Sequence, residues 1–386
     1  MGVEIPESAK IVLLQEEKFK SYYNDLQYAL REYERVTAKV LPKCEELLKP
    51  HIQDMEYKLR PGMITLTWTS MNIDAYKHHI HTGLVKLEEL INNINDIVEN
   101  RVEKNMKTVS KTLLVDLPKD ESFTVESFLA RQDTHVHKVS GILQDYNVMI
   151  ERAIDDIVLV INGYQLDPHI EPPSTSAVEG LKNRYNRQMY MALRKAVTNS
   201  FHAVKKRVGS RGSSGFLFVE RPFFEVDVQL AVPSVRLSPT LDEIQNCINK
   251  TCSGILKSMK TLFNWGQNDV PEEERASFFD LITNDLAIVK VILLLTGSIQ
   301  GLRNQVKEYL ESFLIYDWLW KADMEHAYIH FMSGKPSLIE YKAKLMEFEE
   351  TEAKIGSIVA LHNIGALSLN TRNLKLQLVS LGAGWG

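Results

Sequence analysis

The sequence predicts an all-α protein built from consecutive antiparallel helical bundles that form an elongated rod, with one short β-hairpin or extended arm near residues 216–237. Three observations support this prediction. Apolar residues recur over long stretches at helical spacing, glycine and proline are few, and a single passage alternates apolar with polar residues. A chain of 386 residues, 44% of them hydrophobic, is long enough to bury a substantial core.

Three apolar stripes, each advancing in steps of three or four residues, carry the helical prediction. Such steps return side chains to one face of a helix, so each stripe requires a partner helix to cover it. Because strict heptads are not sustained, the stripes favour bundles over a two-stranded coiled coil. They comprise Phe19, Tyr22, Leu26, Leu30, Tyr33, Val36 and Val40; then Leu84, Leu87, Ile91, Ile94, Val98, Val102, Met106, Val109 and Leu113; and last Ile288, Ile292, Leu295, Ile299, Leu302, Val306, Leu310 and Phe313.

Helix-breaking residues divide the chain into five parts. In the first part, Pro61 and Gly62 end a helix, and the backbone after them is expected to be extended until a helix resumes at Asn72. The predicted parts are a first helical bundle region at 1–163, a proline-rich linker at 164–176, a long basic helix at 177–208, a mobile loop and short β-hairpin at 209–240, and a second helical bundle region at 241–386.

The predicted hairpin is the only β-like passage. Phe224, Val226, Val228 and Leu230 alternate with polar residues, as in a half-buried strand. In the second bundle region, the third apolar stripe is expected to lie on one helix that continues to Met332. A further helix is expected over 337–361. The residues after it begin another helix and suggest a piece of a longer polypeptide, so 371–386 are expected to be poorly anchored.

No catalytic, cofactor-binding or metal-binding residues are predicted. A phosphate-binding loop needs Ser or Thr after Gly-Lys, and the Gly334-Lys335 pair is followed by Pro336. Adjacent histidines lack the i, i+4 spacing of a zinc site on a helix, so they are interpreted as solvated, and two nearby cysteines as small buried residues. These residues are His78, His79, His81, His135 and His137, with Cys247 and Cys252.

The composition predicts a soluble protein of the cytoplasm. Three scattered cysteines indicate a reducing compartment, and the N-terminus has no signal-peptide pattern. The net charge of −5 is too small to attract nucleic acid or a membrane by bulk charge. The most apolar stretch, 289–299, is shorter than the roughly 20 residues of a membrane span, so a buried helix is expected there.

One charge cluster is a candidate partner surface. Nine Lys and Arg residues and no acids lie between Lys182 and Arg211. Three interpretations remain open: a solvated face, a surface for an acidic protein partner, or a nucleic-acid site, which the lack of interleaved aromatics disfavours. The candidate partner-surface residues are Lys195, Lys205, Lys206, Arg207 and Arg211.

Aromatic residues are predicted to serve packing. Trp68 is expected to wedge between helices. The block of Phe313, Tyr316, Trp318 and Trp320 is expected in a core or a bundle joint, with a partner hot spot as the alternative. Because four aromatics this close cannot all face one direction on a helix, at least one of them should lie near the surface.

Three passages resemble the tails of dynein heavy chains. LRPGMITLTWTSMNIDAY at 59–76 resembles that family's Leu-x-Pro-Gly…Leu-x-Trp-x-Ser segment. RPFFEVDVQLAVPSVRLSPTLDEIQ at 221–245 and YLESFLIYDWLWKADMEHAYIHFM at 309–332 resemble later tail segments. The likeness extends over nearly the whole chain and is greatest to axonemal outer-arm heavy chains of cilia.

The resemblance implies a non-catalytic tail segment of a much larger ATP-hydrolysing microtubule motor in the axoneme. It implies a scaffold that links the motor to intermediate chains, neighbouring heavy chains and the doublet microtubule within a large hetero-oligomer, without nucleic acid, membrane or cofactor. The family offers no catalytic residue to carry over. The alternative is a stand-alone helical adaptor or tethering protein.

Overall fold

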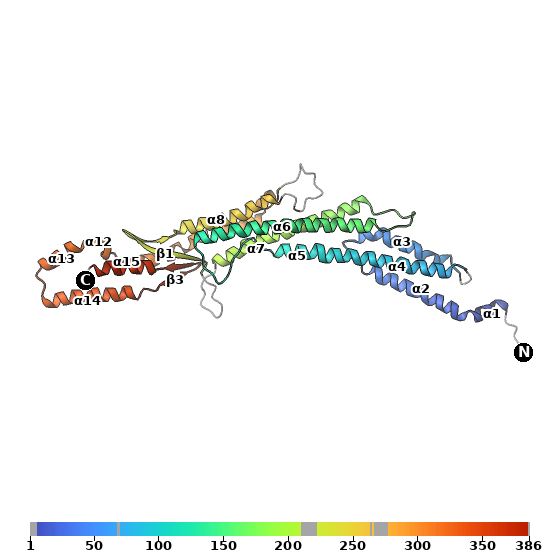
Figure 1. The fold of residues 1–386 in the computed structure, drawn as a ribbon, viewed down its shortest axis with the longest axis horizontal. Coiled ribbons are helices and arrows are strands. Elements are labelled where there is room, and N and C mark those ends of the chain that lie inside the picture. The colour runs from blue at the N-terminus through green and yellow to red at the C-terminus, as the bar shows by residue number, and fades with distance from the viewer. Residues whose placement is uncertain (1–5, 68–69, 210–221, 263–264, 266–276, 385–386) are drawn as a thin grey trace. The chain divides into compact units, whose positions relative to one another are not determined.

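The chain folds into two compact units, which a computed structural model describes over residues 6–67, 70–209, 222–262, 265 and 277–384. Unit 1 comprises 1–110, 143–193 and 264–275, and unit 2 comprises 111–142, 194–263 and 276–386. Helices α6 and α7 each contribute residues to both units. Figure 1 labels many of the elements along the chain.

The first half of the chain is helical. Its elements are α1 (Glu7–Leu14), α2 (Glu16–Thr37), α3 (Glu45–Ile64), α4 (Ile73–Asp96), a π-helical segment (Ile97–Glu103), α5 (Lys104–Lys111), α6 (Val125–Asn162) and α7 (Thr175–Gly209).

The second half adds a small sheet. Its elements are β1 (Phe224–Ala231), β2 (Ser234–Ser238), α8 (Leu241–Ser258), a 3₁₀ turn (Met259–Thr261), α9 (Phe278–Thr283), α10 (Leu286–Leu295), a 3₁₀ turn (Gln300–Leu302), α11 (Arg303–Glu311), a 3₁₀ turn (Ser312–Tyr316), α12 (Trp318–Lys321), α13 (Met324–Ser333), α14 (Leu338–Gly356), β3 (Leu361–Ile364), β4 (Leu367–Asn370) and α15 (Arg372–Ala383).

The second apolar stripe forms the core of unit 1 along α4, the π-helical segment and α5. Every member from Leu84 to Val109 is buried. From Ile94 to Met106 the stripe advances in three successive steps of four, and each step overshoots a full α-helical turn by about 40°. The wider π-helical turn lies in this stretch and keeps these side chains on one face. Helix α4 also packs against α2 and α3, beside which it lies in Figure 1.

Two buried polar residues of α3 tie it to the end of α6 and the loop after it. The His51 ring is fully buried, with Nε2 3.3 Å from the carbonyl oxygen of Ile161 and the ring edge against Tyr164. The Asp54 carboxylate, also fully buried, accepts from the backbone N–H of Asp167 at 3.0 Å. Buried polar groups are costly unless paired, so these contacts fix the loop on α3.

A four-stranded sheet of order β2-β1-β4-β3 organises unit 2. β1 and β2 form the antiparallel hairpin, and β1 pairs in parallel with β4, Phe224 opposite Leu367. Phe224, Val226 and Val228 are buried, so the predicted hairpin and its alternation are confirmed. Residues 216–221 of the predicted passage lie outside the described residues, as does most of the loop at 209–215.

An aromatic cluster packs beside this sheet. Phe128, at the start of α6, meets Phe223 and Phe224 edge-on, with ring centroids 4.9 and 5.5 Å apart. Phe123 joins the cluster, and its backbone N–H donates to the carbonyl oxygen of Phe223 at 2.9 Å. Edge-to-face rings at these distances attract beyond their burial. Segments a hundred residues apart are therefore held together here.

The third apolar stripe is buried or half-buried, but the continuous helix expected for it is wrong. The chain forms α10, α11, α12 and α13, with 3₁₀ turns and loops between them. The side chain of Gln245 on α8 causes the first break: it donates to the carbonyl oxygen of Leu295 at 2.9 Å and accepts from the N–H of Ile299 at 3.0 Å. A distant residue thus satisfies backbone groups that a continuous helix would pair internally.

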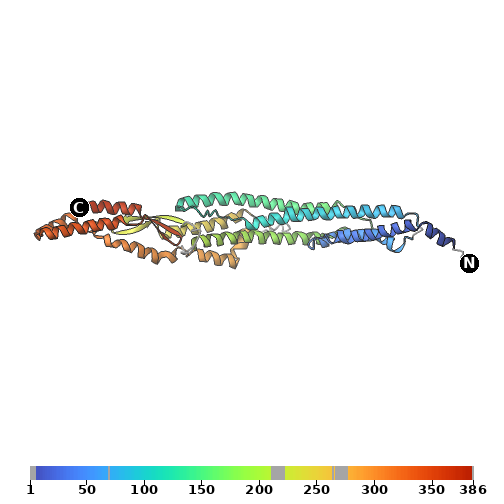
Figure 2. The same cartoon turned by 90° about the horizontal axis from the view of Figure 1, so that it is seen from below.

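Two expectations for the C-terminal stretch are also wrong. The helix expected at 337–361 ends at Gly356, and the missed strands β3 and β4 follow. The residues from 372 to 383 are not poorly anchored, because α15 packs against α14 and β1 and fully buries Leu374 and Leu378. Figures 1 and 2 both show α15 beside α14. The mainly helical class is confirmed, whereas the elongated rod and the five part boundaries stay predictions.

Gly365 predicts a sensitive position in the β3–β4 turn. Its φ of +57° is left-handed, and an added Cβ would lie 2.8 Å from Leu302 Cδ2. Gly365→Ala should therefore lower the free energy of unfolding by about 1–3 kcal/mol. Gly254→Ala is the matched control, since a Cβ added in the middle of α8 would meet nothing within 4 Å apart from its chain neighbours and the backbone of its own helix. Urea denaturation that shows equal stability for the two variants would contradict this account.

The buried histidine predicts a pH effect. Burial lowers the pKa of His51, against opposing contributions from the Ile161 carbonyl and the Asp54 charge. As the pH falls below about 6.5, the unfolded chain binds a proton that the folded chain does not, so stability falls. His51→Gln keeps a donor for the carbonyl and removes this proton. Urea denaturation at pH 7.5 and 5.5 should show a smaller loss for the variant; equal losses would rule out His51 as a source.

Candidate interaction surfaces

The basic candidates lie on the C-terminal part of α7, in unit 2. Lys195, Lys205 and Lys206 are exposed. Arg211 lies outside the described residues. In the N-terminal part of α7, in unit 1, Lys182 is already paired with Asp155 at 3.2 Å. The structure thus leaves three of the five predicted residues as surface candidates, and their partner remains a prediction.

Arg207 is not a surface residue, and its assignment to a partner surface is corrected. The side chain is only 5% exposed. Its guanidinium lies 5.3 Å from the Phe223 ring centroid and donates through Nη2 to the carbonyl oxygens of Pro118, Lys119 and Glu121 at 3.3–3.5 Å. Arg207 therefore fixes the segment before α6 rather than offering charge to a partner.

The aromatic block divides as its spacing requires. Phe313 and Tyr316 are buried, whereas Trp318 and Trp320 are half-buried. The Trp318 ring packs near Phe348 of α14, and Trp320 Nε1 donates to the carbonyl oxygen of Pro233 at 3.3 Å. These contacts favour packing within unit 2 over a partner hot spot. Trp68 lies outside the described residues.

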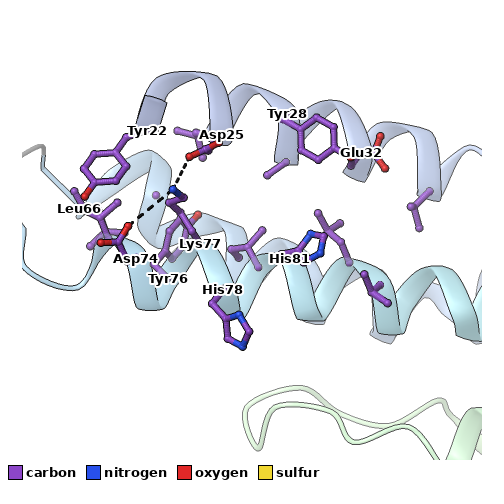
Figure 3. Close-up of a pocket in the computed structure, with 18 of the residues that line it drawn as sticks. Tyr22, Asp25, Tyr28, Glu32, Leu66, Asp74, Tyr76, Lys77, His78 and His81 are labelled. Carbon is purple, nitrogen blue, oxygen red and sulfur yellow. Dashed lines mark ion pairs between the residues drawn. The ribbon is translucent and has the colours of Figure 1, made fainter. Parts of the chain in front are cut away.

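A groove lies between α2 and α4 in unit 1, and the sequence interpretation missed it. It encloses about 570 Å³ over the buried residues Val36, Ile80 and Leu84. Figure 3 shows His81 in the gap between the two helices and His78 on the side of α4 away from α2. His78, His79 and His81 are exposed, in agreement with their interpretation as solvated, whereas His135 is half-buried and its Nε2 lies 3.0 Å from the carbonyl oxygen of Leu113.

Charged pairs close the groove at both ends. At one end, Lys77 Nζ lies 2.5 Å from the Asp25 carboxylate and 5.1 Å from the Tyr22 ring centroid, as Figure 3 shows for the ion pair. At the other end, Arg35 donates to both carboxylate oxygens of Glu88 at 2.8 and 3.0 Å. Asp25 and then Arg35 follow one another along α2, and their partners Lys77 and then Glu88 follow in the same order along α4. The two helices α2 and α4 therefore run parallel.

Glu88 serves as an ion-pair partner in this groove. Hydrogen bonds from Arg35 and then Lys39 lower the pKa of Glu88 to about 2, so it stays a carboxylate at neutral pH.

Tyr76 closes the floor of the groove by donating to the Leu59 carbonyl oxygen at 2.9 Å, and a Cβ at Gly62 would overlap its ring. The Pro-Gly pair noted in the sequence therefore matters because only glycine admits this tyrosine.

The thiols are placed for packing rather than for chemistry. Burial raises the pKa of Cys44 to about 11 and those of Cys247 and Cys252 to about 12, so all three stay protonated at neutral pH. No cluster of three or more His, Cys, Asp or Glu side chains suited to a metal occurs among the described residues. The burial expected for Cys247 and Cys252 is confirmed.

Among the described residues, one stretch, Leu286–Tyr316, is long and apolar enough to cross a membrane by length and composition, and 22% of its apolar 18-residue window is buried. Its α10 helix is ten residues long, or about 15 Å, which is half the thickness of a bilayer core. Ile288, Val291 and Leu295 of α10 are buried in unit 2. The absence of a membrane partner remains a prediction.

Comparison with known proteins gives a consistent result. Residues 1–76 match the family described as dynein heavy chain, N-terminal region 1. The chain is 42% identical over 377 residues to the dynein gamma chain of the flagellar outer arm of Chlamydomonas reinhardtii, which covers 98% of this chain and 8% of that protein.

More distant relatives agree. Identity is 23% over 486 residues to dynein axonemal heavy chain 5 of Mus musculus, which covers 100% of this chain and 10% of the relative. Identity is 21% over 375 residues to the dynein-1-alpha heavy chain of the flagellar inner arm I1 complex of Chlamydomonas reinhardtii. This match covers 92% of this chain and 8% of the relative. The chain thus spans a tenth or less of the length of these relatives. It belongs to the dynein heavy-chain family, among the axonemal heavy chains, and represents part of their N-terminal region.

Proposed function

We propose that this chain is a non-catalytic tail segment of an axonemal dynein heavy chain, located in the cilium. It acts as a scaffold between the motor, the intermediate chains, neighbouring heavy chains and the doublet microtubule. The similarity to an outer-arm gamma chain over 98% of the sequence carries this proposal. Because the chain spans only 8% of that relative, the motor activity belongs to the parent heavy chain.

The packing of unit 1 supports a scaffolding role. Its helices are joined by a buried apolar stripe and by ion pairs that cross between helices, such as Arg101 with Asp156 at 2.6 Å and Arg35 with Glu88. Closely packed apolar side chains between helices resist bending of the bundle. An exposed ion pair adds little to the free energy of unfolding, but it sets the position of one helix along the next. A segment that transmits force needs both properties.

The state of the titratable groups supports the non-catalytic part of the proposal. The described thiols are buried and protonated, and hydrogen bonds from Arg35 and Lys39 hold Glu88 of the groove as a carboxylate. A catalytic acid or base has a pKa near the working pH, and these groups lie far from it. The purified chain should show no ATP hydrolysis above background in a phosphate-release assay.

The exposed lysines of α7 provide the test of partner binding. Changing Lys195, Lys205 and Lys206 together to Glu should reduce retention of intermediate chains from axonemal extracts at least fivefold, because repulsion replaces attraction to an acidic surface. Immunoblotting of material retained on the immobilised 386-residue chain measures this effect.

A second triple variant serves as the matched control. Lys250, Lys257 and Lys290 are exposed elsewhere in unit 2, so their change to Glu alters the net charge equally and should leave retention unchanged. Equal loss in both variants would show that only overall charge matters. No retention by the unmodified chain would contradict the scaffold role for this segment. Arg207→Glu is unsuitable here, because it buries a carboxylate and should destabilise unit 2.

A further inference from the structure

The hairpin formed by α13 and α14 is the least covered part of unit 2. None of the α13 side chains is buried, and α14 buries only Ile355. Nine large apolar side chains on these two helices are more than 40% exposed. They are Met324, Tyr328, Ile329, Met332, Leu338, Ile339, Tyr341, Leu345 and Met346.

Local interactions hold the hairpin but do not cover it. Asp323 caps α13, and Ser337 forms a reciprocal capping box with Glu340 at the start of α14. The rings of Phe331 and Tyr341 lie 6.2 Å apart across the hairpin. Helices of ten and nineteen residues gain most of their stability from tertiary burial, so a surface this apolar requires a partner.

The outward face of α14 has the pattern of a helix-packing seam. Ile339, Ala343 and Met346 follow one another at steps of four and three, on the side opposite the buried Ile355. Ile339 is 81% exposed. Beyond this seam, Glu349 and Glu350 are exposed. A helix that fits here carries apolar side chains opposite Ile339, Ala343 and Met346, and basic side chains opposite these two acids.

The position of α15 indicates where such a helix comes from. α15 runs antiparallel to α14, because Lys375 near its start donates to the Gly356 carbonyl oxygen at the end of α14. It ends at Ala383, and a Cβ added at Gly384 would lie 3.2 Å from Met324 Sδ at the start of α13. The hairpin extends past this point in Figures 1 and 2.

We propose that a helix from the part of the parent heavy chain beyond residue 386 packs on the α13–α14 hairpin and completes a bundle with α14 and α15. This inference rests on the proposed function, in which the chain is one segment of a longer tail. Relatives ten or more times the length of the matched region supply the sequence for this helix. The end of α15 beside Met324 delivers the chain to the open face.

Cross-linking of lysines in the intact parent heavy chain tests the source of the helix. Lys342 is exposed on the outward side of α14, next to the seam, and Lys257 on α8 is an exposed reference outside the hairpin. Mass spectrometry should find Lys342 linked to lysines beyond residue 386 of the same chain, and Lys257 without such links. Links from Lys342 only to another subunit, or to Lys342 of a second copy, would overturn the proposal.

Hydrogen exchange with variants tests whether burial is involved. Amides of α13 and α14 should exchange at least tenfold more slowly in the heavy chain than in the 386-residue chain. Ile339→Asp with Met346→Asp should abolish this difference in the heavy chain and leave the 386-residue chain within twofold. Leu293→Asp with Leu294→Asp, exposed on α10, is the matched control. Equal exchange in both proteins would refute the proposal.

These outcomes are separable from those of the proposed function. The cross-links and the exchange protection arise within one heavy chain, whereas the lysine variants of α7 report on other subunits. Loss of intermediate-chain retention with an uncovered hairpin would keep the scaffold role and reject the inference. A covered hairpin in a chain that retains no intermediate chains would keep the inference and reject the scaffold role. Unchanged exchange in β1 and β4 of unit 2 verifies that each variant folds.

Discussion

The parallel pairing of β1 with β4 is the constraint on which the rest of unit 2 depends. It joins residues 224–227 to residues 367–370 and so closes a loop of about 140 residues that contains α8 to α14. Phe123 forms a bridge to Phe224 from the segment before α6, so three distant parts of the chain meet at one strand. The entropic cost of closing a loop grows only slowly with the length of the loop. The pairing and burial of β1, a central strand of the sheet, can offset this cost.

Patterns that repeat locally predicted most of the helices and the β1–β2 hairpin, whereas features set by distant contacts were missed. The stripe from Leu84 to Val109 was visible because each step depends only on helix geometry. The strands β3 and β4 are four residues each, too short to show a period; β4 pairs with the edge of β1, and β3 pairs with β4. The break after α10 was equally invisible, since it depends on the Gln245 side chain from α8.

The basic helix shows what a charge run can and cannot predict. Leu193, Val197, Ser200 and Val204 are buried at alternating steps of four and three, and the next step of three falls on Arg207. The helical spacing therefore indicates that Arg207 lies on the buried stripe. The number of basic residues in this segment gave no indication of that position. Lys195, Lys205 and Lys206 lie off the stripe and are exposed. The groove between α2 and α4 gave a weaker signal, because pairs such as Asp25 with Lys77 become meaningful only once the two helices are known to be parallel.

Unit 1 and the C-terminal hairpin of unit 2 represent two ways to stabilise a helix, with different consequences for assembly. Where a stripe is buried within the chain, as along α4, the helix is stable before any partner arrives. Where caps and a few ring contacts hold a helix, as in α13 and α14, tertiary burial has still to be supplied. In such a molecule the order of assembly follows from burial: the closed parts fold first, and the open hairpin becomes rigid only when the helix that covers it is in place.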